Sequence, residues 1–199
     1  MNAEENPSPI LLEFRKSVAV VKFNRPSARN SLSTETQSRL STIVQQLTAR
    51  DDLTAIIFTG TDNHFLSGAD IRELSKLDPN QALLFSETGQ RLFQTIADAP
   101  QRTIAAIDGY CMGGGLDFAL SCDVRVASTK AIFAHTGGRL GIITGWGGTQ
   151  RLPRLMGKTR ALEMFLTTRQ ITSSEALKFG LISAIDDDAV GCALRLADV

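Results

Sequence analysis

The sequence predicts an α/β fold in which most strands pair in parallel, and two observations support this. Short apolar runs bounded by glycine or polar residues recur along the chain, and segments with helical spacing of apolar residues separate them. Strands that alternate with helices favour parallel pairing, because each helix returns the chain to the same edge of the sheet. The 199 residues are enough for one domain with a substantial core.

The first third of the chain predicts a hairpin, a helix and a buried strand. In order, they are a hairpin from residues 10–14 and 18–23, a polar loop over 24–30, a helix through 40–47 and a strand over 53–60. Ser33 or Thr34 is a suitable N-cap for the helix. Residues 64–74 then run from a loop with Gly68 into a helical pattern, which leaves free N–H groups from about Gly68 to Ile71. A further helix ends before Pro100.

A second glycine turn, at residues 113–115, follows the predicted strand Ile104–Ile107 and precedes a helical segment over 116–121. The first turn of a helix has N–H groups without internal partners and carries partial positive charge, so this turn suits an oxyanion or a phosphate. Asp117 lies just inside the helix. Two such turns could converge on one ligand atom, as in an oxyanion hole. The dinucleotide signature fails at Phe118 and the P-loop signature fails at Leu152.

The remainder of the chain predicts a shaped loop between short strands and helices. The expected elements are strands over 124–127 and 132–134, helices over 149–156, 159–166 and 174–179, a strand over 181–185 and the beginning of a helix after 186. Six glycines fall in residues 135–148, too many for a packed element, so we expect this loop to line the pocket.

Composition excludes several classes of protein. Twenty-one basic and 21 acidic residues give zero net charge, which argues against nucleic-acid binding. Three cysteines without a C-x-x-C pair fit reduced thiols, and two histidines are too few for most histidine metal sites. The polar, acidic N-terminus is not typical of a signal peptide, and no apolar run reaches the ~20 residues that span a bilayer. We therefore expect a cytoplasmic protein with no metal and no membrane partner.

Six stretches resemble the enoyl-CoA hydratase/isomerase (crotonase) superfamily, in the family's order and across nearly the whole chain. They are Phe23-Asn24-Arg25-Pro26 with Asn30-Ser31-Leu32, the run from Phe65 to Leu74, Asp108 to Asp117, Cys122 to Ala127, Gly147 to Arg154, and Ser174 to Ile182. The resemblance implies a spiral of repeated ββα units, a single domain over residues 1–199, and an acyl-CoA thioester as the substrate. It implies no cofactor other than the coenzyme A of that substrate.

The resemblance also assigns residues by motif position. The thioester oxygen would lie between the N–H groups of Ala69 and Gly114, with Asp117 as the acid/base. Coenzyme A would lie against Ser67, Gly68, Asp70, Ile71 and the loop at Ala28. Arg25 or Arg29 is a candidate for the CoA phosphates, although a solvated arginine is the simpler interpretation of either.

The chain departs from the family pattern where a hydratase has its pair of glutamates. The first position is Asp117 and the second is Gly137, so the second carboxylate is missing. The dienoyl-CoA isomerases also use Asp at the first position, but they need acidic residues where this chain has Gly137 and Gly145. The run His135-Thr136-Gly137 resembles the Gln-Thr-Gly run of the dihydroxynaphthoyl-CoA synthases. In those enzymes a bound bicarbonate can replace the missing carboxylate. They also place an Asp at the position of Thr144, however. No subfamily fits cleanly.

Three hypotheses follow. The first is an enzyme of the hydratase/isomerase type that stabilises an enolate, with Asp117 as its evident acid/base. The second is a CoA-thioester-binding protein with little catalysis. The third places an anion beside Thr136 and Gly137. His135 is a further candidate base, since histidine titrates near neutral pH, although a role in hydrogen bonding the loop is the simpler interpretation. Family members continue with helices that build a trimer or a dimer of trimers, and we expect these to be truncated after about residue 186.

Overall fold

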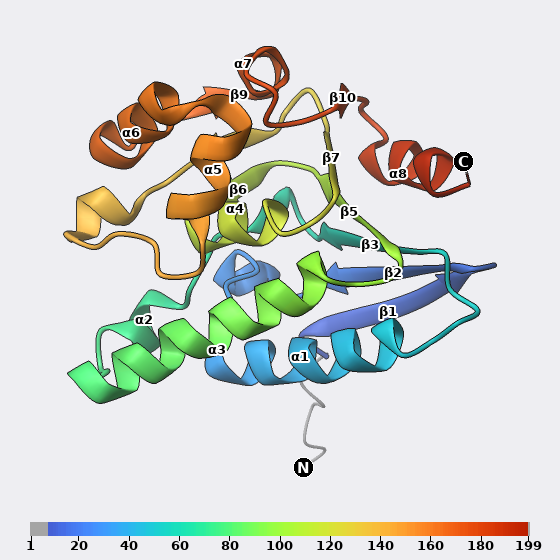
Figure 1. The fold of residues 1–199 in the computed structure, drawn as a ribbon, viewed down its shortest axis with the longest axis horizontal. Helices are drawn as coiled ribbons and strands as arrows, with labels where there is room; N and C mark the ends of the chain where they lie inside the picture. The colour runs from blue at the N-terminus through green and yellow to red at the C-terminus, as the bar shows by residue number, and fades with distance from the viewer. Residues whose placement is uncertain (1–7, 199) are drawn as a thin grey trace.

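A six-stranded sheet forms one layer of the computed structural model, which describes residues 8–198 (Figure 1). Its strand order is β1-β2-β3-β5-β7-β10. These strands are β1 (Ile10–Arg15), β2 (Val18–Phe23), β3 (Ala55–Gly60), β5 (Arg102–Ile107), β7 (Val124–Ala127) and β10 (Ala184–Ile185). β1 and β2 form the antiparallel hairpin that the sequence predicts, and every other pair is parallel. The predicted parallel α/β fold is confirmed.

A second sheet of four short strands gives the fold its spiral character. It contains β4 (His64–Leu66), β6 (Tyr110–Met112), β8 (Ile132–Ala134) and β9 (Ile171–Thr172), in that order. β3, β5 and β7 are each followed, after a short turn, by a strand of the second sheet, namely β4, β6 and β8. A helical segment follows each such pair, so the chain winds through three ββα units, as the family resemblance implies.

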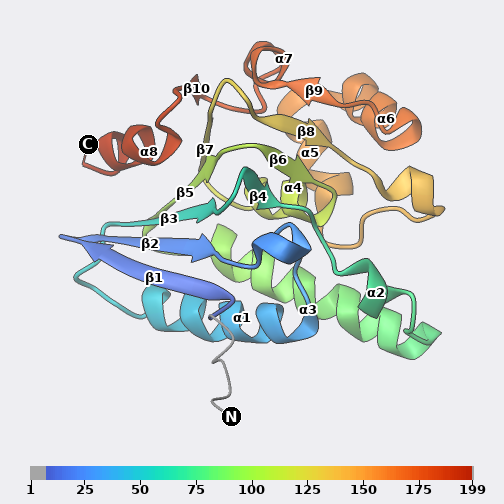
Figure 2. The ribbon, with the colours of Figure 1, turned by 180° about the vertical axis from the view of Figure 1, so that it is seen from behind.

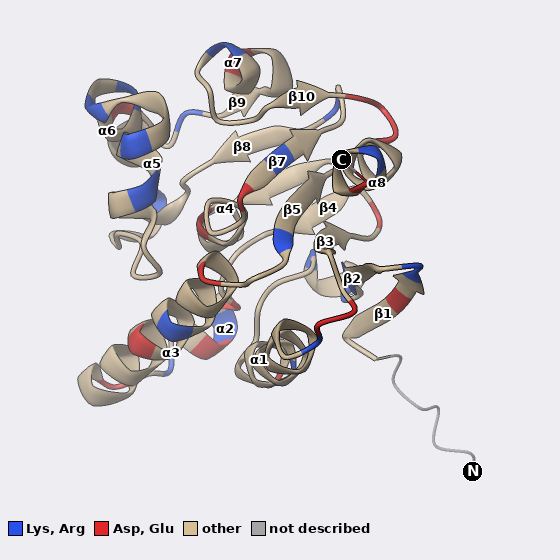
Figure 3. Cartoon of the chain, turned by 45° about the vertical axis from the view of Figure 1, so that its right-hand side comes forward, with Lys and Arg blue, Asp and Glu red and all other residues tan. Residues whose placement is uncertain are grey.

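Helices cover both faces of this framework, and α1 and α3 lie side by side across one of them (Figure 2). The helices are α1 (Thr34–Thr48), α2 (Ile71–Leu74), α3 (Pro79–Ala97), α4 (Gly114–Ala119), α5 (Gly148–Met156), α6 (Lys158–Thr167), α7 (Ser173–Lys178) and α8 (Ala189–Ala197), with 3-10 turns η1 (Pro26–Ala28) and η2 (Gly137–Leu140). Ser33 caps α1 by accepting a hydrogen bond from the Thr36 N–H, as predicted. Charges of both signs are spread over these elements (Figure 3).

Phe118 on α4 lies at the centre of the main core. Its ring contacts those of Phe23, Phe58, Phe65 and Phe93 at centroid distances of 5.3, 5.0, 6.1 and 5.4 Å, mostly edge to face. Aromatic pairs in this geometry each contribute about 0.5–1.5 kcal/mol beyond the burial of their area. The core therefore fixes the position of α4, the helix that follows the triple glycine.

Helix α8 covers the outer face of the six-stranded sheet. Ala189, Ala193 and Ala197 pack against a second group of buried residues that includes Val20 and Ile57. The sequence predicts only the beginning of a helix here, and the structure shows a helix of nine residues that closes one side of the sheet. The predicted strand over 181–185 is shorter in the structure, because only Ala184 and Ile185 pair with β7. Among the described helices, none is long and apolar enough to cross a membrane.

Arg125 on β7 is buried and ties the end of α4 to the distant segment at Leu181. Its guanidinium donates to the carbonyl oxygens of Cys122 at 2.6 Å and Leu181 at 2.8 Å. Burial is the largest influence on the pKa of this guanidinium, and it lowers that pKa. Since a buried donor needs a partner, these carbonyls hold the guanidinium in place and fix the chain at both points.

The buried thiols make a testable prediction about pH. Burial raises the pKa of Cys122 to about 12 and that of Cys111 well above its ordinary value. In the unfolded chain both thiols ionise above about pH 9, whereas in the folded chain they stay protonated. Because the folded state then binds more protons, the free energy of unfolding should fall as pH rises, by about 1.4 kcal/mol per pH unit for each thiol.

The measurement is urea unfolding at a series of pH values between neutrality and about pH 11, compared with a variant that carries Cys111→Ala and Cys122→Ala. The slope above pH 9 should be shallower in the variant. Only the partly buried Cys192 should react with a thiol reagent in the folded protein. Rapid reaction of two or three thiols would contradict the burial argument.

Candidate active site

The two predicted glycine turns meet in the structure. Gly113 adopts a positive φ of 52° before α4, and its own N–H donates to the Ala134 carbonyl. A β-carbon on Gly68 would lie 2.9 Å from the Gly114 nitrogen, and one on Gly114 would lie 3.5 Å from the Ala69 nitrogen. The N–H groups of Ala69 and Gly114 are therefore neighbours, although 45 residues of sequence separate them.

The surrounding backbone positions this pair of donors. Leu32 donates to the carbonyl of Gly68 and accepts from the N–H of Asp70, which holds Ala69 in a short parallel bridge between them. Gly115 lies so close to Leu66 on β4 that a side chain at 115 would collide with its backbone. Within residues 8–198, neither Ala69 N–H nor Gly114 N–H donates to another protein group. Two unpaired donors in a fixed arrangement are what an oxyanion hole requires.

Asp117 lies one helical turn into α4 and is completely buried. The Thr144 hydroxyl donates to its Oδ2, and Nε2 of His135 lies 3.1 Å from its Oδ1. That second contact is close but not aligned as a hydrogen bond, so Oδ1 and Nε2 each lack a partner in the described chain. A buried carboxylate with an unsatisfied oxygen is costly, and such groups gather at functional sites.

Glycine at position 148 makes room for this carboxylate. A side chain there would overlap Oδ1 of Asp117. The His135 ring packs on the other side against Phe165, with ring centroids 4.6 Å apart. The structure therefore brings together three of the residues named from the sequence, Asp117, His135 and Thr144.

The other residues of the glycine-rich loop lie around this cluster. Thr136 lies beside Gly113, since a β-carbon added to Gly113 would be 3.6 Å from the hydroxyl oxygen of Thr136. The carbonyl of Gly145 accepts from the side chains of Ser86 at 3.0 Å and Gln90 at 2.7 Å, which attach the loop to α3.

Gly137, where the family has its second glutamate, faces backbone. A β-carbon at this position would lie 2.7 Å from the carbonyl oxygen of Ile142. That oxygen is an acceptor and would repel an anion. A side chain at position 137 would therefore be crowded by this carbonyl, and the hypothesis of an anion beside Thr136 and Gly137 stays a prediction.

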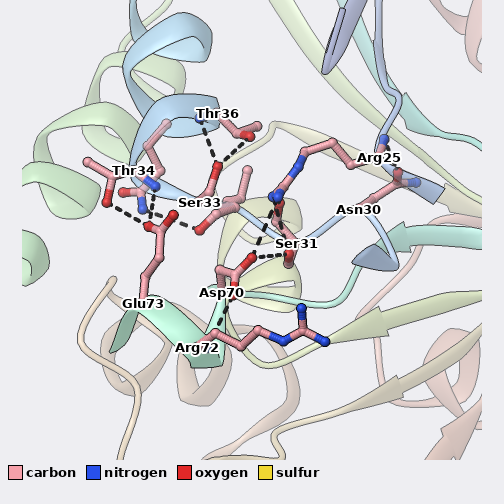
Figure 4. A network of polar contacts seen from close by, with 11 residues as sticks. Arg25, Asn30, Ser31, Ser33, Thr34, Thr36, Asp70, Arg72 and Glu73 are labelled. Carbon is pink, nitrogen blue, oxygen red and sulfur yellow. Dashed lines mark hydrogen bonds and ion pairs between the residues drawn. The ribbon is translucent and has the colours of Figure 1, made fainter. Parts of the chain in front are cut away.

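Polar contacts surround Asp70, one of the residues expected to contact coenzyme A (Figure 4). Ser67 donates through its N–H to the carbonyl of Arg29, which joins this strand end to the turn after Ala28. Asp70 caps α2 through the Arg72 N–H and accepts from the Ser31 hydroxyl at 3.1 Å. Ile71 is 56% exposed and leaves an apolar side chain free at this edge.

The guanidinium of Arg25 contacts other protein groups. Its guanidinium donates to the Ser31 carbonyl at 2.7 Å and lies 3.6 Å from Asp70. The interpretation of Arg25 as a solvated side chain is therefore wrong, because an acceptor and a carboxylate lie within its reach. Arg25 and Asp70 support the loop that carries Ala69.

Trp146 is the residue of this site that the sequence does not reveal. Its six-membered ring lies against Gly114, so that a β-carbon on Gly114 would be 2.5 Å from Cζ3. It is 4% exposed and packs on Phe85 and Phe93 of α3. A single tryptophan in a glycine-rich loop has no periodicity, and only the fold shows which wall it forms.

Comparison with known proteins decides the family. The family model described as enoyl-CoA hydratase/isomerase matches residues 13–193. The chain belongs to the enoyl-CoA hydratase/isomerase family. It is 36% identical to the short-chain-enoyl-CoA hydratase of Clostridium acetobutylicum and 36% identical to the crotonyl-CoA hydratase of Syntrophomonas wolfei. Each match covers 177 residues, which is 88% of this chain and 68% of the relative.

A solved structure supports the same assignment for this hydratase/isomerase homologue. The enoyl-CoA hydratase from Bacillus anthracis superposes with a TM-score of 0.91 at 32% identity, over 96% of this chain and 75% of the other. The chain spans about two thirds of the length of the two curated relatives. These matches confirm the superfamily and the fold that the sequence motifs predict, and they place the chain among enzymes of the hydratase/isomerase type.

Proposed function

We propose that this hydratase/isomerase homologue binds an acyl-CoA thioester with the thioester oxygen between the N–H groups of Ala69 and Gly114. The observation that carries the proposal is the meeting of these two unpaired donors beside a buried carboxylate. When charge moves onto the thioester oxygen, fixed donors stabilise the enolate without reorganisation, each by about 2.7–4 kcal/mol in a comparable site. The same donors would help any reaction that passes through this enolate.

Asp117 is the acid/base of the proposed reaction. In hydration, its carboxylate takes a proton from water while the water oxygen adds to the β-carbon, and the electron pair of the double bond moves toward the thioester oxygen. The protonated Asp117 then returns that proton to the α-carbon as the enolate collapses, so that one water is added in balance. In this scheme Thr144 positions the carboxylate by donating to its Oδ2, and Nε2 of His135 lies 3.1 Å from its Oδ1.

Isomerisation is the second candidate, and the single carboxylate favours it. Moving a double bond along an acyl chain needs one group that removes a proton from the α-carbon and returns it to the γ-carbon. No water has to be held, so the glycine at position 137 is no obstacle. The enolate and the pair of donors are the same in both reactions.

The binding part of the proposal assigns coenzyme A to the edge formed by Ala28, Ser67, Gly68, Asp70 and Ile71. Its support is that four of these residues flank Ala69 in the chain, that the Ser67 N–H donates to the Arg29 carbonyl next to Ala28, and that the Ile71 side chain is exposed. A homotrimer remains a prediction from the family resemblance, and a cytoplasmic location remains a prediction from the composition.

An assay and a titration test the proposal together. Crotonyl-CoA tests hydration, 3-hexenoyl-CoA tests isomerisation, and butyryl-CoA in a calorimeter tests binding without turnover. We expect binding of butyryl-CoA and turnover of at least one enoyl substrate. Binding with no turnover of either would favour a CoA-thioester-binding protein instead, and failure to bind any acyl-CoA would overturn the proposal.

A further inference from the structure

The Trp146 indole is enclosed between two glycines from different helices. Gly89 of α3 lies so close to Nε1 that a side chain at 89 would overlap the ring, and Gly114 of α4 meets its opposite edge at Cζ3 and Cε3. The absence of a β-carbon at both positions makes the space that the indole fills. The ring is 4% exposed and belongs to the buried core, so it is not a surface side chain.

Several contacts fix the ring in this place. Phe85 and Phe93 pack on it with centroid distances of 5.1 and 5.4 Å, and Nε1 donates to the Phe85 carbonyl at 3.4 Å. The neighbouring Gly145 is attached to α3, and Thr144 donates to Asp117. The indole therefore has a set position relative to Asp117 and to the oxyanion donors.

The position of the ring matters for the acyl group. The Ala69 nitrogen and the Cζ3–Cε3 edge both lie on the side of Gly114 where its side chain would point. An acyl group whose carbonyl oxygen is held by Ala69 and Gly114 would begin beside this edge. A flat apolar ring would contact a short acyl chain and obstruct a longer one.

From this geometry we propose that Trp146 is a specificity-determining residue that forms the wall of the acyl pocket and restricts it to short acyl groups. The inference rests on the proposed function, because it needs the thioester to be held at Ala69 and Gly114. One methylene more or less in a hydrophobic pocket changes kcat/KM by about 10–200-fold, so a fixed ring can set a sharp limit on chain length.

The test compares chain lengths in variants of residue 146. We would measure kcat/KM for the trans-2-enoyl-CoA substrates with four, six and eight acyl carbons, and the affinity for the matching saturated acyl-CoAs by calorimetry. Trp146→Leu and Trp146→Ala remove the ring to different extents. We expect the eight-carbon to four-carbon ratio to rise at least about tenfold in both measurements, and more in Trp146→Ala than in Trp146→Leu.

The control is Phe58→Leu, which alters the same aromatic core without a ring contact to Trp146 among the described residues. A purely structural role for Trp146 would lower all substrates together, as Phe58→Leu should, and this result would overturn the inference. If Trp146→Ala does not fold, Trp146→Leu carries the comparison. If the Trp146 variants bind all acyl-CoAs with an unchanged eight-carbon to four-carbon ratio, only the role of Trp146 is contradicted. If the wild type binds no acyl-CoA, the proposed function itself is contradicted.

Discussion

Replacing Asp117 with Asn should lower kcat by about 10²–10⁴-fold and leave the affinity for butyryl-CoA within a few-fold of wild type. The amide has nearly the same shape, so it can still accept a hydrogen bond from Thr144. It cannot take a proton from water or from the α-carbon. The donors at Ala69 and Gly114 remain, and residual turnover above the uncatalysed rate should persist through them. The measurement is steady-state kinetics with whichever enoyl-CoA the wild type converts.

His135 supplies the matched comparison, because its Nε2 lies 3.1 Å from Oδ1 of the same carboxylate. If His135 only positions Asp117, His135→Gln keeps a polar group there and should reduce kcat less than Asp117→Asn does. The result that contradicts the assignment is the reverse order, with Asp117→Asn nearly fully active and His135→Gln inactive. That outcome would transfer the acid/base role to the imidazole.

The elements that the sequence predicts correctly are those with a local signal. The hairpin of β1 and β2, the capped helix α1 and the glycine turn before α4 each follow from periodicity, an N-cap or a strand ended by glycine. Strands β6 and β9 have three and two residues, and they exist because a neighbouring strand supplies their hydrogen bonds. The sequence predicts neither of them, although it does predict the equally short β8, because residues 132–134 form an apolar run.

The candidate site divides in the same way. Asp117 and the two glycine turns are visible in the sequence, because a carboxylate inside a glycine-initiated helix is a local feature. The burial of that carboxylate depends on Gly148 and His135, which both come from the next ββα unit along the chain. The engagement of Arg25 with Ser31 and Asp70 and the place of Trp146 against Gly114 likewise depend on contacts between segments far apart in sequence.

Phe118→Ala should lower the free energy of unfolding by about 3–5 kcal/mol, the largest stability effect that we expect from one substitution. The ring is fully buried and contacts four other phenylalanine rings, so alanine would leave a cavity that rigid neighbours cannot fill. Urea unfolding measures the effect. Leu166→Ala, at a side chain that is 79% exposed, is the control and should change stability by no more than about 0.5 kcal/mol.

The same substitution should also reduce catalysis, since Phe118 follows Asp117 on a helix of six residues. A helix this short has little stability of its own and holds its position through packing. A displacement of about 1 Å at the acid/base can cost about 10²-fold in rate. We therefore expect Phe118→Leu, which keeps much of the packing, to lose less stability and less kcat than Phe118→Ala. If kcat in the folded Phe118→Ala variant equals that of wild type, the aromatic core does not set the position of Asp117.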